Sequence, residues 1–516
     1  MTTQSQSLEL TSAPRQLRRA PSALRLCLTA LLAGGLGVWS AMAAQDAAGK
    51  TGGRGARRGQ AQETRPGRGG PQGGFRTATP AHPYDVVLGR PTDNAVTVSV
   101  LAGEDGHASV RWGTATGDYP NAARPATLRA GEAAQFRLDG LRPDAVGHYQ
   151  VLWQAGDARD WTAGPDRTFR TQRPPGTPFT FALQADSHLD ENTDPALYLQ
   201  TLRNVAADRP DFLVDLGDTF MTGKYGARHE DALPQYLTQR WYFGQACDAV
   251  ALFLVLGNHD GETAGRVTAA VQMRTRLYPN PIPDRFYTGN SAPQEGVGLP
   301  QDYYAWTWGE ALFIVLDPYL LSLEPRAGDR DSNWGRTLGR EQYDWLKATL
   351  ESSRARFRFV FIHHLVGGLD RNARGGTEAA GLYEWGGHDP DGTDSFAMHR
   401  PGWPMPIHQL LVAHGVSAVF HGHDHFFARQ ERDGLVYQLV PQPGHPGNTG
   451  LPRFAAGYGY GDGDLLGGSG HLRVRVDPDE ATVDYVLASV GAGGGASPDN
   501  GRVAFSYALA PRPVAR

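Results

Sequence analysis

Cysteine is nearly absent from this chain of 516 residues, which holds only two, Cys27 and Cys247. Cys27 lies in an N-terminal stretch that we expect to be cleaved, so the mature chain would keep Cys247 alone and form no internal disulfide. A metal site built from several thiolates is excluded for the same reason. With 40% hydrophobic and 20% charged residues, the composition is that of a soluble globular protein large enough to rely on its core.

A hydrophobic run of full membrane-spanning length is also lacking at the N-terminus. The apolar stretch there, Leu26–Trp39, is shorter than the about 18–20 residues that a spanning helix needs, and it contains three glycines. A small-x-small pattern, Ala41-Met42-Ala43, follows it, and four arginines precede it: Arg15, Arg18, Arg19 and Arg25. This order predicts a secretory signal peptide over residues 1–44, with a single membrane anchor as the alternative. We therefore expect a periplasmic or secreted protein.

The body of the protein lacks an excess of positive charge. The formal net charge is −5, and because residues 1–44 contribute +3 and residues 45–82 contribute +5, the remaining chain carries −13. That acidity argues against a nucleic-acid footprint on the folded body. Residues 45–82 are rich in Gly, Arg, Gln and Pro, so they cannot bury enough apolar surface to fold. This composition predicts a disordered tether, and we expect its deletion to leave turnover unchanged. The positive charge of the tether would allow it to contact an anionic surface.

Five apolar runs are each followed directly by residues that bind metals. The runs FTFALQADSH, DFLVDLGD, ALFLVLGNHD, FRFVFIHH and VSAVFHGHDH end in Asp186 and His188, Asp218, Asn258, His363 and His364, and His423 and His425. Near-continuous apolar runs of this length predict strands buried on both faces. In open α/β sheets ligands bind beyond the carboxyl ends of the strands, so these side chains should converge. Their oxygens and imidazole nitrogens suit two ions of zinc, manganese or iron.

Each run taken alone also has a simpler interpretation. An aspartate at a strand end is commonly a turn residue or a helix cap. GNHD or GHDH can be a polar turn, and one of His363 and His364 can be a satisfied core histidine. Five such accidents in one order are less plausible than a single shared site.

The ordered set DSH, GD, GNHD, HH and GHDH resembles the five-block pattern of the calcineurin-like metallophosphoesterase superfamily, over about residues 178–490. The resemblance implies an α/β (α+β) domain over residues 176–516, with two packed mixed β-sheets flanked by helices. It implies two transition-metal ions, one bound by Asp186, His188 and His425, the other by Asn258, His363 and His423, with Asp218 bridging both. His259 would face the leaving group, and Asp260 would orient it.

Residues 83–175 show short alternating runs separated by turn residues, the pattern of a small antiparallel sandwich. They resemble a fibronectin type III-like module, which phosphatases similar to the purple acid group carry ahead of their catalytic domain. No ligands or paired acids gather in it, so we expect a packing or positioning role. One position departs from the purple group, because Met221 stands where its ligand tyrosine would be. Zinc, manganese or a mixed iron site therefore stays open.

The sequence between the five runs predicts helices and loops. Asp194-Pro195 predicts a capped helix, residues 231–247 and Leu338–Leu350 predict two more, and residues 261–305 an irregular insertion. The glycine-rich stretch Gly367–Pro406 should overhang the site as a lid.

The resemblance and the predicted metal ligands imply hydrolysis of a phosphate monoester by metal-activated water. In this hypothesis His259 donates a proton to the departing alkoxide. A phosphodiesterase acting on cyclic nucleotides or lipid headgroups is the second hypothesis, because the same metal core can serve it. A metal-holding binding module without catalysis is the third, and the intact His259 argues against it.

Overall fold

The computed structural model describes residues 74–263, 268–323, 332–447 and 455–512. All of them belong to one compact unit, residues 68–516. The predicted signal peptide, residues 1–44, and most of the predicted tether, residues 45–82, lie outside the described residues. In the part of the chain that is described, no helix has the length and apolar character needed to cross a membrane.

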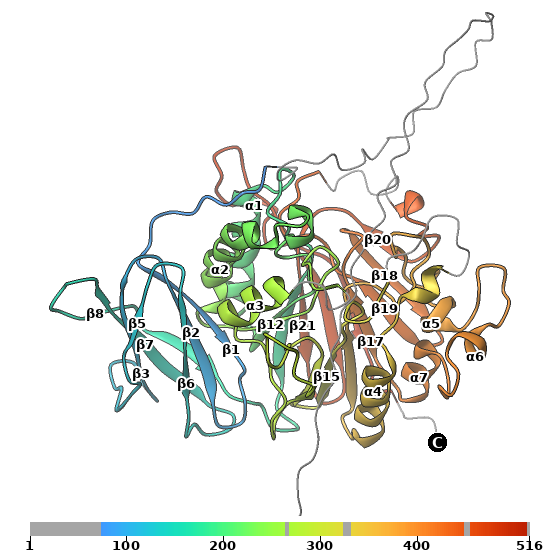
Figure 1. The fold of residues 1–516 in the computed structure, drawn as a ribbon, viewed down its shortest axis with the longest axis horizontal. Coiled ribbons are helices and arrows are strands. Elements are labelled where there is room, and N and C mark those ends of the chain that lie inside the picture. Colours follow the sequence, from blue (N-terminus) through green and yellow to red (C-terminus); the bar gives the residue numbers. More distant parts are fainter. Residues whose placement is uncertain (1–73, 264–267, 324–331, 448–454, 513–516) are drawn as a thin grey trace, which may run out of the picture. The chain divides into compact units, whose positions relative to one another are not determined.

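The described chain begins with two small antiparallel sheets, blue to teal in Figure 1. One holds β1 (Tyr84–Gly89), β2 (Val96–Ala102) and β6 (Ala133–Leu138). The other holds β3 (Gly106–Gly113), β4 (Asn121–Ala122), β5 (Ala126–Leu128), β7 (Val146–Ala155), β8 (Thr162–Ala163) and β9 (Arg167–Arg170). Burial alternates along β7, so every second side chain enters the core as the sequence pattern predicts. The likeness to fibronectin type III stays a prediction.

Two larger mixed sheets form the rest of the unit, as predicted. The first has the order β12-β11-β10-β21-β22-β23: Ala251–Leu254, Phe212–Asp215, Phe179–Gln184, Ser469–Val476, Ala481–Ala488 and Val503–Leu509. The second has the order β13-β14-β15-β16-β17-β19-β18-β20: Thr288–Gly289, Tyr304–Trp308, Ala311–Val315, Phe357–Phe361, Ala418–His421, Leu435–Leu439, Phe427–Arg432 and Asp464–Leu466. Phenylalanines fill the space between them, with the rings of Phe181 and Phe313 5.2 Å apart.

Helices cover the outer faces of both sheets (Figure 1). On the first sheet lie α1 (Pro195–Asp208), α2 (Leu233–Cys247) and α3 (Thr268–Leu277), which share one buried apolar cluster with its strands. On the second lie α4 (Arg340–Ser352), α5 (Tyr383–Gly386) and α7 (Ile407–Ala413), while α6 (Phe396–His399) lies farther out in the same region. The Asp194 carboxylate accepts hydrogen bonds from the Ala196 and Leu197 amides, which confirms the predicted cap of α1.

The prediction of an irregular insertion over residues 261–305 is wrong in part, because α3 forms inside it. The helix carries Arg274 on its buried side, where the guanidinium pairs with the Glu262 carboxylate at 2.7 Å. A buried ion pair replaces apolar residues on that face, so hydrophobic periodicity could not reveal the helix.

Residues 74–82 also depart from the prediction, because this end of the expected tether contacts the folded unit. The Arg76 amide donates to the Leu189 carbonyl at 2.7 Å, and the Phe75 ring stacks on Tyr225 with centroids 5.1 Å apart. The prediction rested on the average composition of residues 45–82, which cannot reveal contacts made by two residues at one end. The segment that we expect to be dispensable is therefore residues 45–73.

Candidate metal centre

The predicted site residues follow the carboxyl ends of β10, β11, β12, β16 and β17, where the two sheets bring them together. Several of them sit in sharp turns whose backbone is left-handed, namely Asp186, His188, Asp218, His423 and His425. This conformation costs about 1–2 kcal/mol for a residue with a side chain. Strain of this kind persists only where the surroundings impose it, and its concentration here is typical of a functional site.

Six of these side chains form two groups of possible metal ligands. One group is Asp186, His188 and His425, the other is Asp218, His363 and His423, and the ligand atoms of each group lie within 4.8 Å of one another. Asp218 Oδ2 lies 3.4 Å from His363 Nε2 in its own group and 3.7 Å from His188 Nε2 in the other. The Asp218 carboxylate is therefore placed between the groups, where it can serve both.

Three buried atoms in this place have no hydrogen-bond partner among the described residues: Asp186 Oδ1, His188 Nε2 and Asn258 Oδ1. Leaving such an atom unpaired costs about 1–3 kcal/mol. Asp186 Oδ1 and His188 Nε2 lie 3.7 Å apart, and a pair of oxygen and imidazole atoms without hydrogen-bond partners fits transition-metal ions of the zinc, manganese and iron class.

Hydrogen bonds at the outer ring nitrogens orient the imidazoles. His363 Nδ1 lies 2.8 Å from the Leu216 carbonyl, and His423 Nε2 contacts the Asn372 carbonyl. A carbonyl only accepts, so these nitrogens carry protons, and His363 Nε2 and His423 Nδ1, 3.3 Å apart, are the ring nitrogens left to face a metal ion. Metal-binding histidines are commonly fixed in this way.

The charges of the site set its protonation. Burial by itself raises the pKa of Asp218, but the imidazoles of His363, His259 and His188 outweigh it and hold this pKa well below its ordinary value. Burial lowers the pKa of His363, yet the Asp218 and Asp186 carboxylates bring it to about 9. The pKa of His188 is likewise raised well above its ordinary value, because the nearby carboxylates of Asp186, Asp190 and Asp218 outweigh burial. The carboxylates thus favour positive charge at the place where cations would bind.

His259 lies beside the two groups and belongs to neither of them. Its Nε2 is 3.9 Å from Asp218 Oδ2, and 29% of its side chain is exposed. Burial lowers the pKa of the ring to about 4, so the expectation of a ring protonated near neutral pH does not hold for the site by itself.

The predicted role of Asp260 is wrong. Its carboxylate is directed at the chain around Asp218 and accepts four backbone N–H groups, those of Gly257, Asp218, Thr219 and Phe220, at 2.8–3.1 Å. No described contact joins it to the His259 ring. Asp260 therefore fixes the turn that presents Asp218, a role that the motif alone could not reveal.

The stretch 367–406 reaches the site through its first ten residues. The Asn372 carbonyl contacts His423, and the Gly375 amide donates to Asp424, the residue between His423 and His425, at 3.0 Å. Sequence reasoning placed this loop over the site, but it could not identify Asn372, because the contact uses only the backbone.

Two further side chains lie near the site. His364 is outside the ligand groups, and Tyr319 was not predicted from the sequence. His364 belongs to neither ligand group; its Nδ1 lies 3.0 Å from the Leu365 carbonyl. Tyr319, buried and with no hydrogen-bond partner for its hydroxyl in the described chain, packs its ring 5.2 Å from that of His364. It follows β15, where the nearby Asp317 belongs to neither ligand group, and a lone tyrosine after a strand is no signal of a site.

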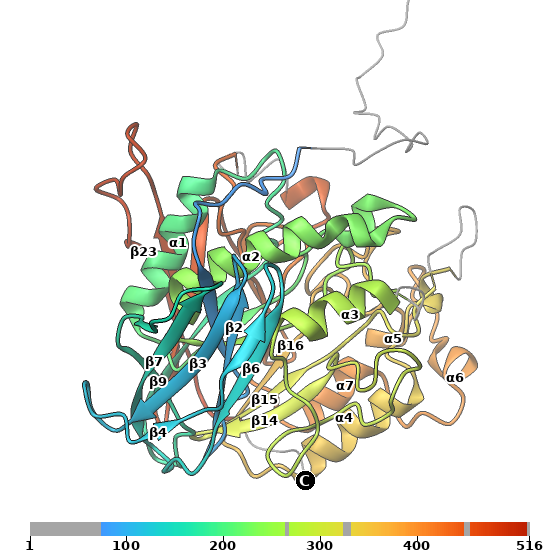
Figure 2. The ribbon, with the colours of Figure 1, turned by 60° about the vertical axis from the view of Figure 1, so that its left-hand side comes forward.

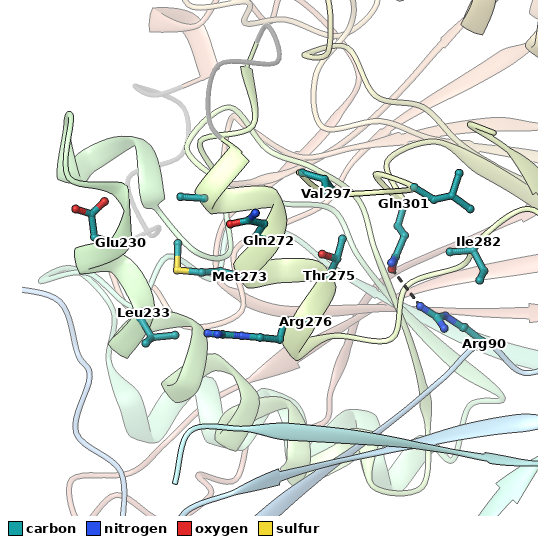
Figure 3. Close-up of a pocket in the computed structure, with 12 residues that line it drawn as sticks. Arg90, Glu230, Leu233, Gln272, Met273, Thr275, Arg276, Ile282, Val297 and Gln301 are labelled. Atoms are coloured by element: carbon teal, nitrogen blue, oxygen red, sulfur yellow. Dashed lines mark hydrogen bonds between the residues drawn. The ribbon is translucent and has the colours of Figure 1, made fainter. Parts of the chain in front are cut away.

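A surface cavity of about 760 Å³ lies elsewhere, along α3 (Figure 3). Leu233, Met273 and Ile282 line it, and Arg90, which it also contains, is bonded to Asn280 and Gln301. None of the predicted site residues lines this cavity, so it has no part in the metal centre.

Comparisons with known proteins agree with this geometry. A model of the calcineurin-like phosphoesterase family matches residues 179–427, the segment that carries every predicted ligand. The chain is 23% identical over 300 residues to tartrate-resistant acid phosphatase type 5 of Rattus norvegicus, which covers 56% of this chain and 78% of the relative.

Two solved structures share the fold. The structure of PhoD superposes with a TM-score of 0.59 at 16% identity, covering 83% of this chain and 90% of that one. Purple acid phosphatase PPD1 from yellow lupin (Lupinus luteus) seeds superposes with a TM-score of 0.53 at 13% identity, covering 82% and 74%. The family match over residues 179–427, together with the two ligand groups inside this segment, identifies the segment as a calcineurin-like phosphoesterase domain, a metal-dependent phosphoesterase with a centre for two transition-metal ions.

Proposed function

We propose that the protein is an exported phosphomonoesterase. Asp186, His188 and His425 would hold one ion and Asn258, His363 and His423 the other, with the Asp218 carboxylate placed to serve both. The observation that carries this assignment is the position of Asp218 Oδ2, 3.4 Å and 3.7 Å from ligand nitrogens of the two groups. The other oxygen, Oδ1, accepts the His259 amide at 2.7 Å, which fixes the orientation of the carboxylate.

The bound ions would supply Lewis-acid charge and a water acidic enough to attack near neutral pH. The chain's own part is to position the ligands and to move a proton. His259 has a partly exposed ring at the edge of the centre, so its Nε2 can reach the leaving-group oxygen of an ester. A phosphate dianion beside the ring raises its pKa, because an opposite charge favours the protonated form. His259 then donates a proton to the departing alkoxide.

Export is supported by the arginines, the apolar stretch and the small-residue pattern of residues 1–44. In this proposal the signal peptide is removed, the tether of residues 45–73 spaces the enzyme from whatever surface its charge contacts, and the substrate is met outside the cytoplasm.

A panel of alkyl and aryl monoesters, cyclic nucleotides and lipid-headgroup diesters tests the substrate class. We expect monoesters to be hydrolysed with higher kcat/KM than diesters carrying the same leaving group. Faster hydrolysis of the diesters would assign the protein to phosphodiesterases. Binding of metal without hydrolysis of any member would favour a binding module.

A further inference from the structure

Residues 74–82 run along the helix-covered side of the molecule before β1 begins, as the blue chain in Figures 1 and 2 shows. This segment contains no helix or strand, and most of its side chains are exposed. Three consecutive residues nevertheless contact three separate parts of the catalytic domain. We call Phe75, Arg76 and Thr77 the N-terminal clasp.

The first contact is with the turn that carries His188. The Arg76 amide donates to the carbonyl of Leu189, the residue after His188, at 2.7 Å, and its guanidinium donates to the Glu191 carbonyl at 3.2 Å. Asp186, His188 and Leu189 all have left-handed backbones, with φ of 58°, 50° and 51°. A turn of this kind needs outside support to keep its shape. Arg76 supplies part of that support, together with Gln235, whose side chain donates to the His188 carbonyl.

The second contact is with the turn beside His259. The Phe75 ring stacks on Tyr225 with centroids 5.1 Å apart and planes at 16°. Tyr225 ends the short 3₁₀ helix Thr222–Tyr225, in which the Gly223 amide donates to the His259 carbonyl at 2.8 Å. The clasp therefore reaches the proposed proton donor through a single turn of backbone.

The third contact anchors the clasp itself. The Thr238 hydroxyl, on α2, lies 3.0 Å from the Thr77 carbonyl and shares its proton between that carbonyl and the Pro234 carbonyl of its own helix, 2.8 Å away. Since α2 packs in the same apolar cluster as α1 and the first sheet, this bond ties the clasp to a rigid element. The two site turns are then held from one fixed point.

We propose that the N-terminal clasp is a positioning segment of the metal centre, which keeps the His188 turn in the shape that retains its ion. The clasp bonds directly to the turn of His188, so the ion held by Asp186, His188 and His425 depends on it first. The turn that carries Asn258 and His259 is reached only indirectly, through Tyr225 and the Gly223 amide, so release of the ion held by Asn258, His363 and His423 should change less. The inference rests on the proposed ligand assignment but not on the substrate.

A double variant of the full chain and a single control test the clasp. Phe75→Ala/Arg76→Pro removes the ring stack, the guanidinium bond to Glu191 and the amide proton given to Leu189. The control, Thr79→Ala, changes a residue of the same segment outside the clasp and keeps all three contacts. Metal content is followed over time in the presence of a chelator, and the unfolding temperature of each metal-free protein is measured alongside.

We expect the clasp variant to lose one of its two ions about tenfold faster than the wild type, the lower end of the loss in metal affinity seen when a ligand's outer support is removed. The control should release metal at the wild-type rate, and the metal-free proteins should unfold at similar temperatures. Equal release rates in the clasp variant and the control would overturn the proposal, as would faster loss of both ions together with a lower unfolding temperature. A wild-type chain that binds no metal would overturn the proposed centre, and the clasp with it.

If the clasp variant does not fold, Arg76→Ala decides the question against Thr79→Ala. Arg76→Ala keeps every backbone hydrogen bond of the segment and removes the guanidinium bond to the Glu191 carbonyl, next to the His188 turn. Faster release of one ion supports the clasp, and unchanged release overturns it.

Discussion

His259 lies 3.9 Å from Asp218 but outside both ligand groups, which separates its chemistry from metal binding. We expect His259→Asn to keep two ions per chain and to lower kcat by about 10²- to 10⁴-fold on alkyl phosphates, the usual loss for a general acid. The loss should be much smaller for nitrophenyl phosphate, whose leaving group needs little protonation. Parallel kinetics on both esters measure the difference. An equal loss on both, or loss of metal, would leave His259 with a positioning role.

Asp260 is expected to act through the backbone that presents Asp218. Asp260→Ala would leave four buried amides without an acceptor, and since each unsatisfied group costs about 1–3 kcal/mol, we expect a loss of about 3 kcal/mol or more in unfolding free energy. Asp260→Asn keeps one acceptor oxygen and should lose less. Denaturant unfolding of both variants measures this order. Equal stability of Asp260→Ala and the wild type would contradict the assignment.

Metal binding should depend on pH through the histidine ligands. The carboxylates of Asp218 and Asp186 outweigh burial and raise the pKa of His363 to about 9, so below that pH the free site holds a proton that the ion must displace. Affinity should therefore rise with pH between about 6 and 9, tenfold per unit for each proton displaced, and level off above. Competition against a chromophoric chelator, corrected for its own titration, measures the slope. Affinity independent of pH would contradict the charges described.

For single residues, the sequence predicted which side chains lie together in the site, but it did not predict every contact that they make. Asp186, His188, Asp218, His363 and His423 converge as the strand-end pattern indicated. The role of Asp260 and the contact of Asn372 could not be predicted, because both are made with backbone groups, which leave no mark on residue type.

Among the elements, the loop that begins at Gly367 holds His423 in place through Asn372. Its turn depends on Gly368, where φ is +63° and a Cβ would lie 2.2 Å from Ala373 Cα. We expect Gly368→Ala to displace Asn372 and to speed metal release to a chelator about tenfold.

Gly392→Ala is the matched control, because Gly392 lies in the same stretch with φ of +87°, but a Cβ there would meet no other atom within 4 Å. It should release metal at the wild-type rate. Indistinguishable release from both variants would show that the loop does not support His423.

The strands and their crossover helices could be predicted because their apolar runs and caps are local signals, as at Asp194 before α1. The helix α3 and the clasp could not, since each depends on contacts across the chain. Arg274 pairs with Glu262 inside the fold, and Phe75 stacks on Tyr225, 150 positions further along the chain.

At the scale of the whole molecule, the N-terminal sheets and the catalytic domain are packed as one unit. Arg240, fully buried in α2, donates to Asp85 of β1 at 2.9 Å and to Ser99 of β2 at 3.0 Å. Val87 and Leu101 from the same strands join the apolar cluster of α1 and α2. The positioning role predicted for residues 83–175 agrees with this packing, although the sequence could show neither the ion pair nor the shared cluster.

The central claim is that two ions, held by residues from both large sheets, carry out the hydrolysis. Elemental analysis of the purified protein beside its His423→Ala variant, each assayed for phosphate release, tests it most directly. We predict close to two transition-metal ions per wild-type chain, fewer in the variant, and a loss of phosphate release that follows the loss of metal. A full metal complement in His423→Ala, or phosphate release that persists after the metal is removed, would contradict the account.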